Sequence, residues 1–200
     1  SEPTAASPRY TGPVEIGKSA HFRATALREG GENASYSREF AFSKSTGRPA
    51  VLNTKPNDSY TFEGASLLVD GYHSRPVFTS GAWLGYLDEP LDVTIDMGGE
   101  QSYRSVELET LAEKGDWIFP PSSVTVWVSD NGTDFTEVAS VTVPEAKAGD
   151  ADGIGRYRMQ FPETSARYLK VVAQNAAAIP AWHPGAGSKG FLFVDEIVVE

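Results

Sequence analysis

Aromatic and imidazole side chains gather in three segments that also carry Gly, Pro or Ser and are therefore expected to be loops. They are Tyr72, His73 and Arg75 in the first segment, Trp117 in the second, and Trp182 and His183 in the third. The CH face of a pyranose stacks on an aromatic ring, and its hydroxyls bond to planar polar groups. We therefore take these six residues as candidates for carbohydrate binding, with Trp182 beside His183 as the strongest platform.

Packing in the protein interior is the alternative role for the tryptophans. Trp83 and Trp117 are expected to close the ends of the fold, as large aromatics do when their neighbours are apolar, like Ile118 and Phe119. Packing is favoured for these two residues, whereas both roles stay open for Trp182.

Two carboxylates interrupt the last apolar segment. Residues 191–199 are apolar on both faces of an extended chain apart from Asp195 and Glu196, which is typical of a strand buried on both sides. Buried carboxylates need a cation, an arginine or backbone donors. The segment therefore predicts a buried polar site.

No catalytic constellation is found in the sequence. The three histidines lack a metal-binding spacing, no Gly-x-Ser-x-Gly is present, and no pair of carboxylates for glycoside cleavage stands out among the scattered acids. Residues 185–190 resemble a phosphate loop only superficially, because Ser188 precedes Lys189 and no strand-loop-helix spacing matches. We expect this chain not to be an enzyme by itself.

Composition excludes several classes of partner. The 200 residues carry a formal net charge of −10 and no run of Lys and Arg longer than a pair, so neither nucleic acid nor an anionic membrane surface is expected. The absence of cysteine excludes disulfides and cysteine zinc sites. The longest apolar runs have the length of strands, so membrane insertion is not expected either.

The elements that position the candidate residues are expected to be strands. Short apolar or alternating segments recur between Gly, Pro, Asn and Asp, without convincing helical periodicity. The expected strands are 20–26, 39–43, 91–97, 106–111, 124–129, 135–143, 155–161, 168–173 and 191–199, with turns at Gly98-Gly99 and Asp130–Thr133. The spacing predicts an all-β fold in which a small β-sheet module precedes a sandwich or jelly roll.

The domain boundary is expected near Thr46–Asn57. This segment holds two prolines, a glycine and two asparagines with little apolar pattern. We expect an N-terminal module at 1–48, a linker at 49–58 and a second module at 59–200.

The opening residues Ser1–Val14 resemble part of a known module. They are similar to the middle of the chitobiase/β-hexosaminidase C-terminal module, whose pattern includes Ser-x-Pro-Thr and then Tyr-x-Gly-Pro. The resemblance implies a partial module at 1–48 that begins partway through a hairpin.

Residues from about 60 onward resemble discoidin-like (F5/8 type C) domains. The matching blocks follow the order of that family and are Leu68–Gly71, Trp83, Val93–Gly98, Pro121–Gly132, Ala166–Val171 and Phe193–Ile197. The resemblance implies a galactose-binding-like jelly-roll β-sandwich, of a kind that commonly binds sugar through loops gathered at one end.

Two blocks point to a particular parent enzyme. Trp117–Pro120 and Ala181–Gly185 look like the discoidin-like tail of glycoside hydrolase family 20 β-N-acetylhexosaminidases. The resemblance implies a non-catalytic, monomeric accessory piece of a bacterial enzyme that is periplasmic, cell-surface or secreted. The expected partner is a glycan of the N-acetylhexosamine or galactose type. The alternatives are a structural module that packs on the parent catalytic domain, and a protein-adhesion module.

The same family commonly holds a structural calcium near its Asp-Gly loop and its final strand. The corresponding positions are Asp70 and Glu196, with loop carbonyls completing an oxygen-rich shell. The family's short loop is replaced here by the longer segment 70–83. In the alternative, Glu196 caps loop amides or pairs with an arginine.

Overall fold

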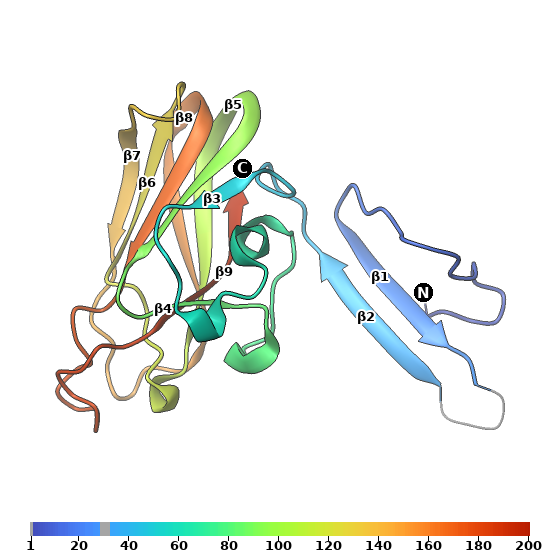
Figure 1. The fold of residues 1–200 in the computed structure, drawn as a ribbon, viewed down its shortest axis with the longest axis horizontal. Helices are drawn as coiled ribbons and strands as arrows, with labels where there is room; N and C mark the ends of the chain where they lie inside the picture. Colours follow the sequence, from blue (N-terminus) through green and yellow to red (C-terminus); the bar gives the residue numbers. More distant parts are fainter. Residues whose placement is uncertain (1, 29–32) are drawn as a thin grey trace. The chain divides into compact units, whose positions relative to one another are not determined.

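The computed structural model describes residues 2–28 and 33–200, which form two compact units, Ser1–Phe42 and Ser43–Glu200 (Figure 1). Both units are built from antiparallel strands, joined in the second unit by short 3-10 helices. The expected all-β fold, with a small sheet followed by a discoidin-like sandwich, is confirmed.

The first unit is a two-stranded antiparallel sheet. Strand β1 (Ala20–Ala26) has the bounds expected from the sequence, whereas β2 covers Ala34–Phe40 in place of the expected 39–43. The register pairs Ala20 with Phe40 and Ala26 with Ala34. β2 therefore begins earlier than its apolar residues indicate, because backbone pairing to β1 extends over polar side chains as well.

The second unit contains the remaining strands. They are β3 (Ala50–Leu52), β4 (Leu84–Tyr86), β5 (Leu91–Ala112), β6 (Ser123–Ser129), β7 (Thr136–Thr142), β8 (Gly153–Gln174) and β9 (Leu192–Val199). The hydrogen-bonded order is β4-β9-β5-β8-β6-β7, and β3 pairs with β5. The 3-10 helices are η1 (Asp58–Tyr60), η2 (Gly64–Val69), η3 (Phe78–Ser80) and η4 (Lys114–Asp116). None of the described helices is long and apolar enough to cross a membrane.

Two long strands take part in both layers of the sandwich. The first part of β5 pairs with β3 and with the end of β8, and its last part pairs with β9 and with the start of β8. The register shifts between Asp96 and Gln101, where the expected turn at Gly98-Gly99 lies. That turn prediction is wrong, because the two glycines lie at a register shift within one continuous strand.

The expected linker 49–58 lies inside the second unit. Residues Ala50–Leu52 form β3, in which Ala50 pairs with Ile95 of β5. Just before it, the hydroxyl of Ser45 donates to the carbonyl of Ile197 on β9. The structure therefore divides the chain at Phe42, because backbone and side-chain hydrogen bonds tie the proline-containing segment to the sandwich.

The core of the sandwich lies between its two layers. Its fully buried members include Leu91, Val93 and Ile95 from the first part of β5, Leu108 from the last part, and Leu192 and Val194 from β9. β9 is buried along almost its whole length, with Asp195 and Glu196 only 1% and 0% exposed. The prediction of a final strand buried on both sides is confirmed.

Close packing on β4 gives a test of this arrangement. A Cβ at Gly85 would lie 2.9 Å from Cζ of Phe193 and 2.9 Å from Cβ of Tyr60. We expect Gly85→Ala to lower the free energy of unfolding by about 1–3 kcal/mol in urea titrations, because the core must shift. Gly99→Ala, where the added methyl meets nothing within 4 Å, is the control. Equal stability of the two variants would contradict the packing described for β4.

Candidate functional site

Trp117, Trp182, His183 and Phe119 form an aromatic cluster. The cluster comes from the segment after η4 and from the loop between β8 and β9, which lie at one end of the sandwich (lower end in Figure 1). The ring of His183 lies 6.1 Å from that of Trp117 and 5.6 Å from that of Trp182, both edge-on. Two loops far apart in the sequence therefore bring the candidates Trp117, Trp182 and His183 together.

His183 holds this cluster together from the inside. It is 8% exposed, and its Nδ1 lies 3.0 Å from the amide of Gly185, which donates to it. The imidazole hydrogen is therefore on Nε2, which lies 2.9 Å from the carbonyl oxygen of Lys114. Since both nitrogens are engaged within the chain, His183 positions the two indoles and offers no polar atom to a ligand.

The two tryptophans of the cluster keep much of their surface in solvent. Trp117 is 43% exposed and Trp182 is 39% exposed. The indole nitrogen of Trp182 donates to the carbonyl of Ala146 at 3.0 Å, which fixes the ring. Trp83, in contrast, is fully buried. The packing role expected for Trp83 is confirmed, whereas Trp117 has a large exposed surface.

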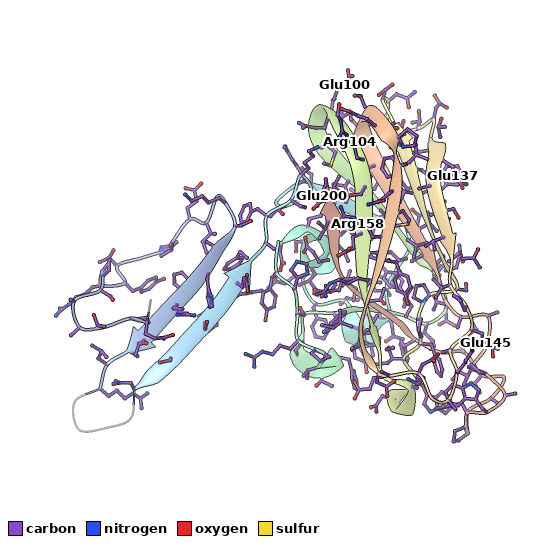
Figure 2. The ribbon with its side chains drawn as sticks, turned by 180° about the vertical axis from the view of Figure 1, so that it is seen from behind. Glu100, Arg104, Glu137, Glu145, Arg158 and Glu200 are labelled. Carbon is purple, nitrogen blue, oxygen red and sulfur yellow. The ribbon has the colours of Figure 1, made fainter. Side chains whose placement is uncertain are left out.

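A pocket of about 480 Å³ lies beside Trp182. It is lined by residues 119–122, 143–146 and 176–181, among which only Ser122 and Glu145 carry polar side chains. Figure 2 shows Glu145 at the end of the sandwich opposite Glu100. An apolar pocket of this size with a few polar groups has the general character of a small-ligand site. Neither Trp117 nor Trp182 lines it, but Ala181 and Ala146 do, and these are the chain neighbour and the hydrogen-bond partner of Trp182.

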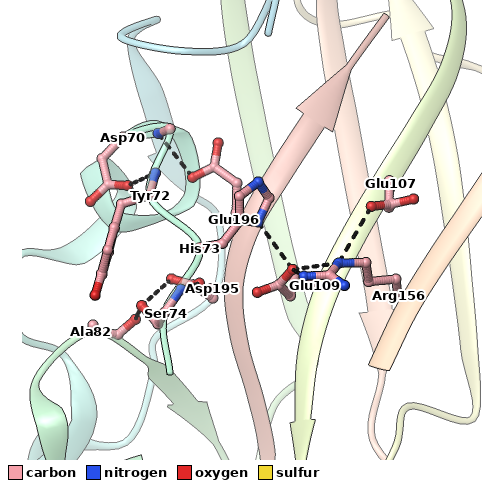
Figure 3. A network of polar contacts seen from close by, with 11 residues as sticks. Asp70, Tyr72, His73, Ser74, Ala82, Glu107, Glu109, Arg156, Asp195 and Glu196 are labelled. Atoms are coloured by element: carbon pink, nitrogen blue, oxygen red, sulfur yellow. Dashed lines mark hydrogen bonds and ion pairs between the residues drawn. The ribbon is translucent and has the colours of Figure 1, made fainter. Parts of the chain in front are cut away.

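The other three candidate residues lie in a different environment. His73 is half-buried, and its Nδ1 lies 3.0 Å from a carboxylate oxygen of Glu109, which Arg156 also contacts at 2.8 Å (Figure 3). Arg75 is exposed, and its carbonyl accepts a hydrogen bond from the indole of Trp83. Tyr72 is half-buried, and its amide donates to Asp70. His73 and Tyr72 thus belong to a polar network, Arg75 lies beside the buried Trp83, and none of the three has a described contact with the aromatic cluster.

The centre of this network is formed by the two carboxylates of β9. Ser74 donates to Asp195 from its amide at 2.7 Å and from its hydroxyl at 3.1 Å. The amide of Gly71 donates to Oε2 of Glu196 at 3.1 Å, so Glu196 caps a loop amide as the alternative interpretation expected. Oε1 of Glu196 is buried and has no hydrogen-bond partner among the described residues.

Burial changes the protonation of this network. Burial, together with the negative charges of Asp70 and Asp195, raises the pKa of Glu196 to about 10. Burial also raises the pKa of Asp195 to about 7, although the hydrogen bonds from Ser74 act in the opposite direction. The hydrogen bond to Glu109 raises the pKa of His73. All three shifts favour the protonated form in the folded chain.

The surroundings of Glu196 can be tested for their fit to a cation. The described residues include no group of three His, Cys, Asp or Glu side chains arranged to hold a metal ion. A cation beside Glu196 would therefore need loop carbonyls in addition to Asp70. The unpartnered carboxylate oxygen and the mutual repulsion of Asp70, Asp195 and Glu196 fit a hard cation that takes oxygen ligands.

Glu109 is a member of the network that sequence reasoning missed. In the alternating segment Val106–Leu111 it occupies an expected solvent position, yet it is 1% exposed. The pairing of β5 with β9 shifts register between Leu108 and Thr110, so the simple alternation of faces fails there. Nothing in the single sequence marks this irregularity.

The pKa shifts predict how stability depends on pH without added metal. Groups whose pKa is raised on folding stabilise the folded state at low pH, and this stabilisation is lost as the pH rises. We therefore expect the free energy of unfolding, measured by urea titration in chelator-containing buffer, to fall as the pH rises from about 5 to about 9.

Glu196→Gln isolates the contribution of that carboxyl group. Glutamine cannot ionise, so at pH 8 we expect this variant to be more stable than the parent by about 1–3 kcal/mol, with a weaker pH dependence. If the stability of the unsubstituted chain stayed constant or rose from pH 5 to pH 9, the assigned pKa shifts would be contradicted.

Comparison with known proteins supplies the family. The F5/8 type C domain matches residues 53–189, and the family described as Fn3 associated matches residues 1–40. The chitobiase-type module expected at the N-terminus therefore stays a prediction. No curated protein matches the chain.

Two solved structures share the fold. One is chitosan-binding module 1 of a chitosanase/glucanase from Paenibacillus sp. IK-5, at 18% identity and TM-score 0.51, covering 79% of this chain and 98% of that one. The other is CpGH89CBM32-5 from Clostridium perfringens, in complex with GalNAc-β-1,3-galactose, at 17% identity and TM-score 0.51, covering 76% and 93%. Since the match to residues 53–189 covers most of the chain, this protein belongs to the F5/8 type C domain family.

Proposed function

We propose that the second unit is a carbohydrate-binding module and that it binds sugar at the aromatic cluster. The observation that carries the proposal is the exposure of Trp117 and Trp182 on either side of His183. An apolar pocket lined by Ala146 and Ala181, which adjoin Trp182, supports it. Contacts within the chain hold each indole in place, so binding costs little conformational entropy. Fixed, exposed aromatic faces suit the CH face of a pyranose.

The pocket beside Trp182 favours a sugar with an apolar substituent. Its lining is mostly Ala, Pro, Val, Ile and Phe, and Ser122 and Glu145 can bond to hydroxyl or amide groups. The methyl group of an N-acetyl substituent would bury apolar surface there. This supports N-acetylhexosamines over galactose as the ligand class, and the complex of CpGH89CBM32-5 contains a sugar of that class.

The parent protein that we propose is a bacterial β-N-acetylhexosaminidase of glycoside hydrolase family 20 that is secreted, periplasmic or on the cell surface. The support is the sequence resemblance of Trp117–Pro120 and Ala181–Gly185. In such an enzyme the module would keep the catalytic domain near its glycans.

Sugar titration tests the binding function. N-acetylglucosamine, N-acetylgalactosamine and galactose are added while NMR shifts and tryptophan fluorescence are followed. We expect saturable changes that are stronger for the two N-acetyl sugars, that are lost in Trp182→Ala, and that persist in Trp182→Phe, which keeps a stacking ring.

Arg75→Ala is the matched control for this titration. The residue is exposed but lies outside the aromatic cluster, so this variant should bind like the parent. Loss of binding in Arg75→Ala alone would move the site to the first loop. Flat responses to all three sugars at millimolar concentration would refute sugar binding and favour a module that packs on its catalytic domain.

We further propose that Asp70 and Glu196 bind a structural calcium ion together with carbonyls of the loop 70–83. The support is the buried, unpartnered Oε1 of Glu196 and the raised pKa that a nearby cation would reverse. Bound calcium would neutralise the repulsion among the carboxylates and fix the loop over β9.

Thermal unfolding tests the calcium site. Calcium at about 100 times its Kd should stabilise the folded state by about 2.7 kcal/mol and raise Tm by roughly 5–10 °C. Asp70→Asn and Glu196→Gln should lose this response, whereas Glu145→Gln, at an exposed acid outside the network, should keep it. The site would be refuted if calcium did not raise the Tm of the unsubstituted chain, or if it raised the Tm of Glu196→Gln by the same amount.

A further inference from the structure

Two exposed aromatic residues are held in an unfavourable backbone conformation. Among the residues that the structure describes, Phe62 and Trp117 are those other than glycine with positive φ, at 35° and 63°. Their side chains are 45% and 43% exposed. A bulky residue in this conformation is strained, and glycine would avoid the strain.

Packing in the core does not explain why aromatic side chains occupy these two positions. Nearly half of each side chain faces solvent, whereas fully buried aromatics such as Trp83 and Phe193 close the interior. Strain of this kind concentrates at functional sites, where a particular side chain must be presented in a particular direction. Trp117 already belongs to the proposed sugar site, which leaves Phe62 without an assigned role.

Two ring contacts and one backbone hydrogen bond connect Phe62 to that site. The ring of Phe62 lies 6.4 Å from the ring of Tyr60, which lies 5.5 Å edge-on from the ring of Phe191. The amide of Phe191 donates to the carbonyl of Trp117 at 2.8 Å. We call the set Phe62, Tyr60, Phe191, Trp117, His183 and Trp182 the aromatic row.

The exposed members of the aromatic row alternate with less exposed ones. Phe62, Trp117 and Trp182 are exposed, whereas Tyr60 and Phe191 are half-buried and His183 is buried. Phenylalanine and tryptophan carry no charge, and both nitrogens of His183 are engaged within the chain. Separate, uncharged platforms of this kind suit successive pyranose rings of one chain.

We propose that the aromatic row binds an uncharged oligosaccharide, with Phe62 stacking on a sugar unit remote from the one held at Trp182. This inference rests on the proposed carbohydrate-binding function and deepens it, because it assigns a chain of sugar units as the ligand. Each added platform increases affinity for a longer ligand without changing affinity for a single sugar.

Isothermal titration of the full chain with sugars of two lengths tests the proposal. The probes are N-acetylglucosamine against chitotetraose, and galactose against galactotetraose. For the sugar series that binds, we expect the parent to bind the tetrasaccharide more tightly than the monosaccharide. Phe62→Ala should lower tetrasaccharide affinity about 3- to 10-fold and leave monosaccharide affinity unchanged.

Phe62→Gly separates loss of the ring from loss of stability. It removes the ring as Phe62→Ala does, but it also relieves the left-handed strain, so it should be the more stable of the two variants in thermal unfolding. We expect both variants to lose the same share of tetrasaccharide affinity. A loss of tetrasaccharide affinity that is smaller in the more stable Phe62→Gly than in Phe62→Ala would overturn the role of Phe62.

The remaining outcomes separate the two proposals. Monosaccharide binding with no gain for the tetrasaccharide, or a tetrasaccharide affinity unaffected by Phe62→Ala, would overturn the aromatic row and leave the sugar site at Trp182 intact. A parent that binds none of the four probes would overturn both proposals together.

Discussion

The burial of two acidic side chains in β9 is the constraint on which the second unit depends. β9 lies between β4 and β5 and is covered on both faces, so Asp195 and Glu196 cannot reach bulk solvent. Their oxygens need donors, and the loop after η2 supplies them from the amides of Gly71 and Ser74. These hydrogen bonds hold the start of the loop against β9, which explains why a polar segment lies so close to the core.

Much of the fold could be predicted from local sequence patterns. Alternation and turn residues indicate the strands, and the acidic pair in an apolar run indicates a buried polar site. The errors occur where pairing between distant strands overrides local signals. Gly98 and Gly99 remain within β5 because its pairing with β8 resumes at Gln101 after a register shift. Ala50–Leu52 form a strand because they pair with residues 93–95 of β5. Glu109 turns inward at a register shift that involves β9, about which its own neighbours in sequence carry no information.

The candidate site was predictable in residue type but not in arrangement. Trp83 and Trp117 have similar sequence surroundings, yet the first is fully buried and the second is 43% exposed. The difference depends on the left-handed backbone at Trp117 and on Gly185, where any Cβ would come within 2.8 Å of the indole. Likewise, His183 and His73 are both imidazoles in expected loops, but their hydrogen-bond partners give one a packing role and the other a place in the carboxylate network.

The position of β9 also governs when this unit can fold during synthesis. Ser45 bonds to Ile197 and the amide of Lys44 bonds to Val199, so the first residues of the sandwich close onto its last strand. Until β9 leaves the ribosome, β4 lacks its partner and part of β5 is an open edge. Closure in a single late step, through contacts of high sequence separation, is intrinsically slow. The nascent unit would therefore present β4 and part of β5 unpaired until its last strand is made, and chaperones act on exposed strand edges of this kind.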